Sequence, residues 1–221
     1  MGMGYTLNFA AVWGSFDKLL SGLSLGLGLA ALAILIGVAF GLVGGFASVS
    51  PSRPIRRLAS LYVTVFRNLP ILVIVLIAYF ALPDAGIRLD KYTSFILSLG
   101  LYAGAYLTEV FRAGLLSVPK GVVEAGRAIG LTRLQTSAYV VAPIMLRNAL
   151  PALGSTMISL FKDTSIAAVI AVPELTFQAR KINTESFRVV ESWGVASGLY
   201  IVTCFLLAAG LRRLESRFPK F

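Results

Sequence analysis

Five long apolar segments dominate this sequence and leave few folds open to it. They cover residues 19–46, 58–82, 92–116, 149–172 and 193–211. Each is close to the roughly 20 helical residues that cross the hydrocarbon core of a bilayer. Inside a bilayer only helices and closed barrels satisfy every backbone hydrogen bond, and uninterrupted apolar runs of this length are typical of helices. The pattern therefore predicts an all-α, polytopic membrane protein with about five transmembrane helices.

The composition excludes several other classes of protein. Of the 221 residues 57% are hydrophobic and only 14% are charged, whereas soluble domains carry about 25% charged residues. There is no histidine and only one cysteine, Cys204. No internal disulfide can form, and a transition-metal site would need carboxylates alone. We therefore expect no disulfide scaffold, metal site or soluble enzyme core, and we interpret residues 1–221 as a single transmembrane domain.

The basic residues are divided unequally between the two sides of the predicted membrane. If the N-terminus faces outward, the inner segments carry two acids, Glu124 and Glu215, and twelve basic residues: Arg53, Arg56, Arg57, Arg112, Lys120, Arg127, Arg133, Arg147, Arg212, Arg213, Arg217 and Lys220. The basic and acidic residues of the outer segments cancel. Lys and Arg concentrate on the cytoplasmic side of membrane proteins, so the net charge of +10 predicts a periplasmic N-terminus and a cytoplasmic C-terminus. We therefore attribute the excess of positive charge to the orientation of the chain in the membrane and not to binding of nucleic acid.

Small residues recur in the first apolar run, in the patterns Gly22-x-x-x-Gly26 and Gly37-x-x-x-Gly41. Such patterns let two helices pack closely. We expect this packing to lie within the subunit rather than at a dimer contact. No basic region precedes the run, which is also too long for a cleaved signal, so we expect it to be retained as a helix.

The longest inner segment, residues 117–148, contains the pattern of a short helix. Ala125, Gly126 and Ala128 give this helix a flat face, and Gly130 is placed to end it. A flat surface of small residues allows another protein to approach closely. The residues alone leave a second interpretation open, in which an amphipathic helix lies on the lipid surface.

The same segment resembles the EAA loop of bacterial ABC importer permeases. Glu124-Ala125-Gly126, three residues, Gly130, nine residues and Val140-Val141-Ala142-Pro143 follow the pattern E-A-A, three residues, G, nine residues, I-x-L-P. Gly126, Val140 and Ala142 are small or aliphatic replacements. Three other stretches are similar to the polar amino acid uptake family: FRNLP at residues 66–70, YLTEVFRAG at 106–114 and KDTS at 162–165. The resemblance extends in order from about residue 18 to 215.

This resemblance implies a transmembrane subunit that carries a polar or charged amino acid from the periplasm to the cytoplasm through the bacterial inner membrane. An ABC ATPase would dock on the coupling loop, through Glu124, Ala125, Gly126, Gly130 and Pro143. A periplasmic solute-binding protein would deliver the amino acid, and a second permease subunit, identical or different, would complete the pathway. The chain has no phosphate-binding loop. We therefore expect no enzyme activity and no cofactor in this chain, with ATP and Mg bound by the partner ATPase.

Charged residues inside the predicted spans are candidates for the substrate pathway, because a charge in the bilayer is costly unless it faces a partner or a cavity. Arg67 lies deep in the second span, shortly before Pro70, which predicts a kink. It either contacts a substrate carboxylate or pairs structurally with Glu109 or with freed carbonyl groups. Glu109 precedes Arg112 by three residues, the spacing of a local ion pair on a helix. It is the weaker candidate.

The sequence Lys162-Asp163-Thr164-Ser165 interrupts the fourth span near its middle. Interrupted helices at this depth are a recurrent way to build a transport site. Asp163 can accept bonds from a substrate ammonium, while Thr164 and Ser165 can donate to its carboxylate. Alternatively, Lys162 and Asp163 neutralise each other and the hydroxyls bond to their own helix.

Two rival functions were weighed against transport. An intramembrane enzyme would use Asp163 and Glu109 as paired carboxylates, but the chain shows no set of nucleophile and base. A passive channel would need no loop for an ATPase. Both rivals therefore explain fewer of the motifs than an ATP-driven importer does.

Overall fold

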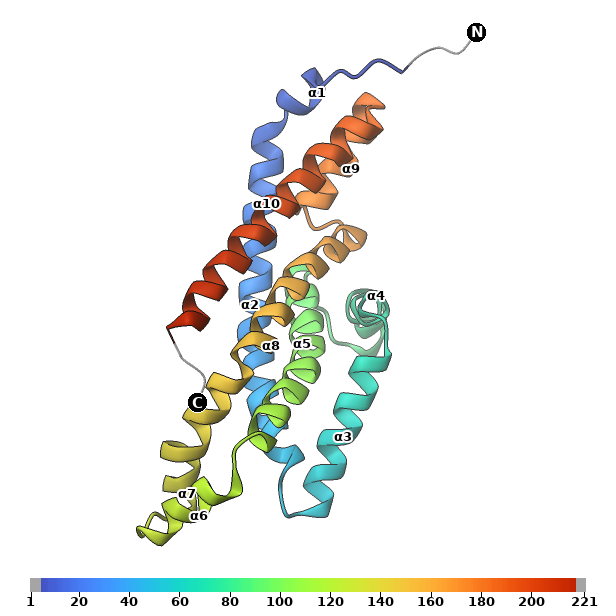
Figure 1. Cartoon of the computed structure of the whole chain (residues 1–221). Helices are drawn as coiled ribbons and strands as arrows, with labels where there is room; N and C mark the ends of the chain where they lie inside the picture. The colour runs from blue at the N-terminus through green and yellow to red at the C-terminus, as the bar shows by residue number, and fades with distance from the viewer. Residues whose placement is uncertain (1–4, 218–221) are drawn as a thin grey trace.

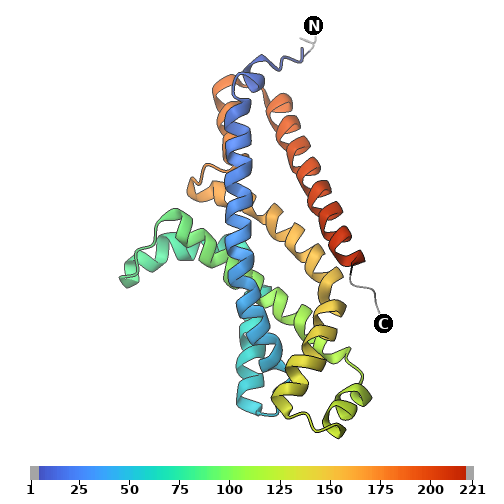
Figure 2. The same cartoon turned by 90° about the vertical axis from the view of Figure 1, so that its left-hand side faces the viewer.

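The computed structural model describes residues 5–217, and in that range it contains helices but no strand. The longest helix, α2 (Phe16–Ser48), follows the short α1 (Ala10–Trp13) and runs along most of the molecule (Figures 1 and 2). Three further stretches are long and apolar enough to cross a membrane: α5 (Lys91–Leu116), α10 (Val189–Ser216), and the helical stretch Arg133–Ile170 that contains α8 (Ala142–Asp163). A bent pair of helices raises the number of candidate spans to five. The all-α fold class is confirmed.

The second predicted span is broken rather than straight. α3 (Arg53–Asn68) and the helical stretch Ile71–Ala85 meet at an angle of 99°. That stretch consists of α4 (Ile71–Leu76), a π-helix η1 (Ile77–Ala81) and a 3₁₀-helix η2 (Leu82–Ala85). Leu69, at the break, is extended, with ψ 134°, because the residue before a proline is driven out of the helical region and Pro70 has no N–H to donate. The kink expected at Pro70 is confirmed, and it turns the chain sideways (Figure 2).

The fourth long helix begins earlier than the predicted boundary at residue 149. α7 (Arg133–Thr136), the π-helix η3 (Ser137–Val141) and α8 form one helical stretch. Thr132 caps it in a capping box with Gln135, which fixes the start of the helix. Pro143 follows the π turn, the kind of local adjustment that accommodates a missing N–H. Residues 133–148, expected to belong to the loop, are therefore helical, and a 3₁₀-helix η4 (Thr164–Ile170) follows α8.

The core of the molecule is the contact between α2 and α5. A Cβ added to Gly37 would lie 2.7 Å from the Cβ of Ala103, and one added to Gly41 would lie 2.6 Å from the Cβ of Leu107. Real Cβ atoms do not approach so closely, so the helices can meet at this distance only because these positions are glycine. The small-residue pattern therefore packs within the subunit, as predicted.

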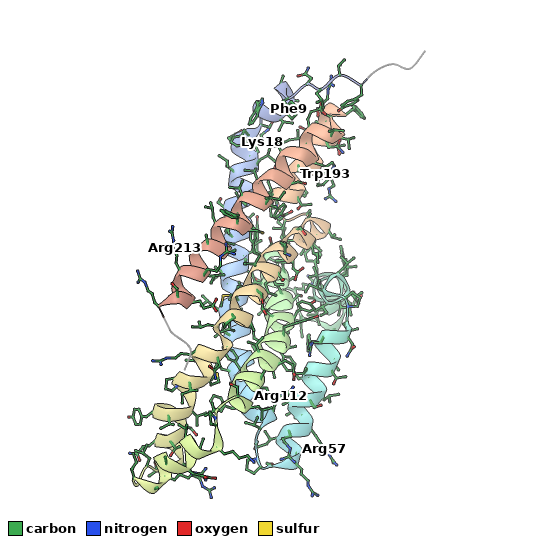
Figure 3. The ribbon with its side chains drawn as sticks, viewed as in Figure 1. Phe9, Lys18, Arg57, Arg112, Trp193 and Arg213 are labelled. Atoms are coloured by element: carbon green, nitrogen blue, oxygen red, sulfur yellow. The ribbon has the colours of Figure 1, made fainter. Side chains whose placement is uncertain are left out.

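The two ends of the molecule carry different short helices. At one end, α9 (Leu175–Ser186) packs against the first half of α2 and the first half of α10. At the other end, α6 (Lys120–Ala128) and α7 form the tip (Figure 1). Phe9, Lys18 and Trp193 lie toward the α9 end, and Arg57 and Arg112 lie toward the tip (Figure 3). Lys220, counted among the inner basic residues, falls outside the described residues.

Candidate functional site

Arg67 occupies the last turn of α3, directly before the break in that helix. Its guanidinium carbon lies 5.1 Å from the centroid of the Tyr106 ring, a cation–π contact. Tyr102 lies one turn away on α5 and donates a hydrogen bond of 3.2 Å to the Tyr106 hydroxyl. Within residues 5–217, Arg67 forms no ion pair with Glu109 or any other carboxylate. The structural Arg67–Glu109 pair considered from the sequence is therefore absent from this conformation.

Asp163 is the last residue of α8, at the point where this helix passes into the 3₁₀-helix η4. Its side chain is half-buried. Lys162 is exposed and, in the part of the chain that the structure describes, forms no ion pair with Asp163. Arg67 thus lies at the end of α3 and Asp163 at the end of α8, and the two tyrosine hydroxyls lie on α5.

The two hydroxyls that follow Asp163 are placed differently from each other. Thr164 is fully buried, donates to the carbonyl of Phe161 at 2.7 Å and lies against Gly26. Thr164 thus follows the alternative in which the hydroxyl bonds to its own helix, because 3₁₀ winding directs its side chain into the contact with α2. Its donation to a substrate stays a prediction. Ser165 is only half-buried and keeps its hydroxyl free of hydrogen bonds to the described residues.

Glu109 is held within α5 by the residue one turn further on. Arg112 Nη2 lies 2.6 Å from Glu109 Oε2, and Arg112 Nε lies 3.2 Å from each carboxylate oxygen. This is the local ion pair predicted from the i,i+3 spacing. The pair places Glu109 with Arg112 rather than with Asp163, so the two carboxylates weighed for an enzyme are not assembled into one site.

The helix predicted between residues 122 and 130 is α6, at the tip of the molecule. Glu124 and Ala125 are exposed on it, whereas Gly126 is buried against the side chains of Thr136 and Val140. Gly130 ends the turn that follows α6 with φ 91°, the left-handed region that favours glycine. Pro143 is exposed in the first turn of α8. The five residues of the EAA pattern lie in α6, in the turn that follows it and in the first turn of α8. Together with α7 and η3, these segments form what we call the helical hairpin.

Several large apolar side chains of this hairpin are exposed. Ile129 and Leu134 are each 80% exposed, and Tyr139 is 74% exposed. Large apolar side chains exposed to this degree are typical of a contact with a protein or with lipid. The tip therefore has the chemistry of a docking surface, with the basic residues Arg127 and Arg133 beside it.

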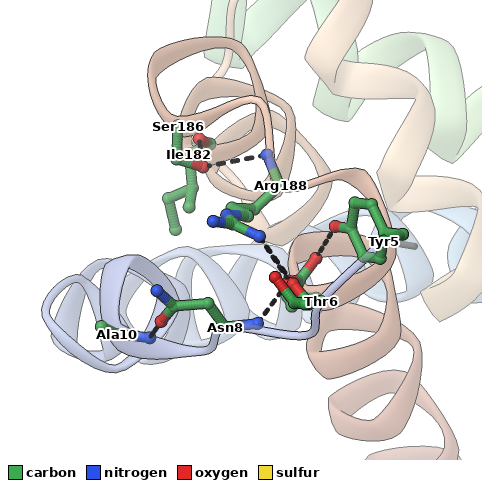
Figure 4. Close-up of polar contacts among 8 residues, drawn as sticks. Tyr5, Thr6, Asn8, Ala10, Ile182, Ser186 and Arg188 are labelled. Atoms are coloured by element: carbon green, nitrogen blue, oxygen red, sulfur yellow. Dashed lines mark hydrogen bonds and ion pairs between the residues drawn. The ribbon is translucent and has the colours of Figure 1, made fainter. Parts of the chain in front are cut away.

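At the opposite end, a buried carboxylate holds the start of the chain in place (Figure 4). Glu191, in the first turn of α10, is fully buried and accepts hydrogen bonds from the Tyr5 hydroxyl and, at 2.7 Å, from the Asn8 backbone N–H. Arg188 lies 3.6 Å from Glu191 and donates to the Thr6 carbonyl at 2.9 Å. The hydrogen bond to the carboxylate raises the pKa of Tyr5 above its ordinary value.

A second buried carboxylate organises α9. Glu174 accepts bonds from the backbone N–H groups of Thr176 and Phe177 at 2.9 and 2.8 Å and from the Tyr200 hydroxyl at 3.0 Å. It therefore caps α9 and ties it to α10. Glu174 and Glu191 both belong to the predicted outer segments, whose basic and acidic residues cancel. A readable signal existed only for Glu174, an acid directly before a helical run.

Tyr102 and Tyr106 lie at this candidate site but are not among the residues predicted from the sequence. Aromatic residues in an apolar span are ordinary lipid-facing or core residues, so neither was singled out. Their signal was the i,i+4 spacing, which places both hydroxyls on one face of α5. Only the position of Arg67 over Tyr106 identifies that face as polar.

Comparison with known proteins places this arrangement in a family. Residues 33–218 match the family described as binding-protein-dependent transport system inner membrane component. The chain is 37% identical to the glutamine transport system permease protein GlnP of Escherichia coli (strain K12), over 95% of this chain and 97% of that protein. It is 35% identical to the L-cystine transport system permease protein TcyB of Bacillus subtilis (strain 168), over 98% and 95% of the two chains.

Solved structures give the same result. The chain superposes with a TM-score of 0.89 on a chain of an amino acid ABC transporter crystallised with histidines, at 33% identity over 96% of this chain and 100% of that one. A chain of the MetNI methionine ABC transporter shares the fold, with a TM-score of 0.81 at 20% identity.

The chain therefore belongs to the family of binding-protein-dependent transport system inner membrane components. It is a multi-pass inner-membrane subunit of an ABC importer, and its resemblance to the polar amino acid permeases is confirmed. Such a subunit is a transport protein rather than an enzyme, because ATP hydrolysis belongs to a separate subunit.

Proposed function

We propose that this chain passes a polar or charged amino acid across the inner membrane along the tyrosine hydroxyls that lie near Arg67 and Asp163. One observation carries the proposal: Arg67, directly before the break after α3, lies over the ring of Tyr106, whose hydroxyl accepts a hydrogen bond from Tyr102 on the same face of α5. Helices broken at mid-membrane are the usual means of presenting charged and backbone groups to a transported solute. Here the break after α3 presents a cation, and the passage from α8 into the 3₁₀-helix η4 presents an anion.

The chemistry of this site matches the constant part of an amino acid. A guanidinium binds a carboxylate through two parallel hydrogen bonds, so Arg67 would hold the α-carboxylate. Asp163 would accept from the α-ammonium, and the hydroxyls of Tyr102, Tyr106 and Ser165 can donate or accept along the path. None of these groups is assigned to the variable side chain of the substrate, so the site would accept several amino acids.

The helical hairpin at the tip would couple this site to ATP hydrolysis. An ABC ATPase subunit, which binds ATP and Mg, would receive the surface formed by Glu124, Ala125, Gly126, Gly130 and Pro143. The exposed apolar side chains of Ile129 and Leu134 would become buried in that contact. Because short turns join α6 to α5 and to the helical stretch Arg133–Ile170, a rigid-body movement of the ATPase would move both long helical elements. A lipid-bound hairpin would give no such coupling.

The remaining partners follow from the orientation set by the basic residues. With a periplasmic N-terminus, the α9 end faces a solute-binding protein and the tip faces the cytoplasm. A second permease subunit, either another copy or a sister chain, would close the open side of the pathway. Membrane lipid would cover the apolar outer faces.

Uptake by the reconstituted transporter tests the proposal. The chain would be assembled with its ATPase and binding protein in vesicles, and uptake of labelled amino acids measured for Asp163→Asn and Arg67→Gln. Each change removes a charge-assisted hydrogen bond, so uptake should fall by about tenfold or more while the yield of the complex is kept. Asp84→Asn is the matched control, because Asp84 is exposed on η2, away from the tyrosines.

A double substitution at Lys162 and Asp163 separates ligand binding from structural neutralisation. If neutralising both residues restored full uptake, Asp163 would act as the partner of Lys162 and not of the substrate. Uptake that is independent of ATP would instead favour a channel.

A further inference from the structure

A polar cavity of about 430 Å³ opens near the tip, next to the tyrosine hydroxyls but distinct from them. Its lining includes the end of α2, one face of α3 and the last turns of α5. The polar groups on its wall are Ser48, Arg56, Ser60, Thr64, Arg67 and the Glu109–Arg112 pair. Only Arg67 is shared with the site above. The cavity therefore continues from that site toward the end of the molecule where Arg57 and Arg112 lie (Figure 3).

The wall of the cavity carries more positive charge than its own contacts neutralise. Three guanidinium groups face one carboxylate, and Arg112 already holds that carboxylate at 2.6 Å. Arg56 uses one nitrogen, Nη1, to donate to the carbonyls of Ser50 and Pro51 at 2.6 and 3.0 Å. Arg67 contacts the face of Tyr106. Neither Arg56 nor Arg67 has a carboxylate partner among residues 5–217, so the cavity has a net charge of +2.

Hydroxyl donors on the wall are also unused. Ser48, Ser60 and Thr64 make no side-chain hydrogen bond within the described part of the chain, in contrast to Thr108 on α5, which donates to the Gly104 carbonyl. Two unpaired guanidinium groups with three free hydroxyls form a site for an anion that has several acceptor oxygens. A carboxylate fits this set of donors, because guanidinium binds it in a bidentate fashion and hydroxyls complete its shell.

We propose that this cavity is a second, inner site for the transported amino acid, which holds the carboxylate of neutral and acidic amino acids and disfavours basic ones. The inference rests on the proposed function, and Arg67 provides its continuity, because Arg67 belongs to the upper site and also lines the cavity that contains Arg56. Because the cavity opens on the inner side, an amino acid that has accumulated there re-enters it and slows further import. Two net positive charges repel a basic side chain and attract an acidic one.

Import against a filled lumen tests this site. Vesicles containing the complete transporter would enclose ATP with unlabelled L-glutamate, L-glutamine or L-arginine, and the binding protein and labelled substrate would be outside. Lumenal glutamate and glutamine should slow the initial uptake rate, and arginine should not. In Thr64→Glu and Ser60→Glu, an added carboxylate occupies the cavity, so about tenfold more lumenal amino acid should be needed for the same inhibition.

Ser52→Glu is the matched control. Ser52 precedes α3 at the same end of the molecule, outside the cavity, and its side chain caps no helix. The added negative charge near a helix N-terminus is well tolerated, so inhibition should remain as in the wild-type protein. Thr64→Gln adds bulk without charge and separates the two effects.

The possible outcomes distinguish failure of the inner site from failure of the proposed function on which it rests. If the wild-type transporter imports no amino acid, the proposed function fails, and the inner site fails with it. If it imports one but lumenal amino acids have no effect, or inhibit Thr64→Glu and Ser60→Glu as strongly as wild type, only the inner site is refuted. If uptake instead depends on phosphatidylglycerol in the vesicles, and both Glu variants abolish that dependence, the cavity binds a lipid phosphate and the inference is overturned.

Discussion

At Gly130 the backbone has φ 91°, and an added Cβ would meet no atom within 4 Å. The constraint at this residue is therefore conformational rather than steric. The left-handed region costs other L-residues about 1–2 kcal/mol, so any substitution favours a different turn between α6 and α7. The neighbouring Gly121 also has open space but an ordinary φ, which makes the two glycines a matched pair.

We predict that Gly130→Asp abolishes uptake and ATPase binding while membrane insertion is retained. The strained turn and the added charge both alter the docking surface. Gly121→Ala should retain transport, because alanine is the better helix former. Co-purification of the ATPase, together with membrane yield, measures both effects. Normal ATPase binding by Gly130→Asp would show that the hairpin is not the coupling surface.

Individual side chains show how far the sequence could be read. The Glu109–Arg112 pair and the glycine stop at Gly130 follow from local spacing, and both are present. The burial of Thr164 against Gly26 could not be predicted, since it depends on how η4 packs against α2. Arg67 on α3 contacts Tyr106 on α5. The chain between these two residues includes the 99° break after α3, and no local sequence pattern encodes that angle. Interactions within one helix or turn can therefore be predicted from the sequence, whereas contacts between elements cannot.

Among the helices, the contact between α2 and α5 depends on glycine at the closest points. A Cβ on Gly41 would lie 2.6 Å from Leu107, whereas one on Gly28, in the same helix, would have no neighbour within 4 Å. Transmembrane helices associate by close van der Waals packing, because lipid provides no hydrophobic force between them. The loss of that packing therefore acts directly on stability.

We predict that Gly41→Ala destabilises the purified subunit by about 1–3 kcal/mol, the usual cost of overpacking. α2 and α5 must separate to admit the methyl group, so the thermal midpoint in detergent should fall. Gly28→Ala should leave the midpoint unchanged or raise it slightly. Equal midpoints for the two variants would argue against tight packing at Gly41.

For the whole molecule, the length of the helices fixes where the tip can lie. α2 has 33 residues, or about 50 Å at 1.5 Å per residue, which exceeds the roughly 30 Å hydrocarbon core. α6 follows the end of α5 and lies with α7 at one end of the molecule (Figure 1), so we expect the hairpin to project beyond the bilayer on that side. The sequence predicted this loop but not its helical extension through residues 133–148.

The last prediction concerns the side of the membrane that the hairpin faces. The segments on its side carry the whole excess of positive charge, which predicts that they face the cytoplasm. In a Cys204→Ser background, single cysteines would replace Asp84, Lys181 or Arg133, which are all exposed. In intact cells with a permeable outer membrane, an impermeant maleimide should label positions 84 and 181, whereas position 133 should react only after the inner membrane is opened. Labelling of position 133 alone would reverse the topology, and an ATPase in the cytoplasm could then not reach the coupling hairpin.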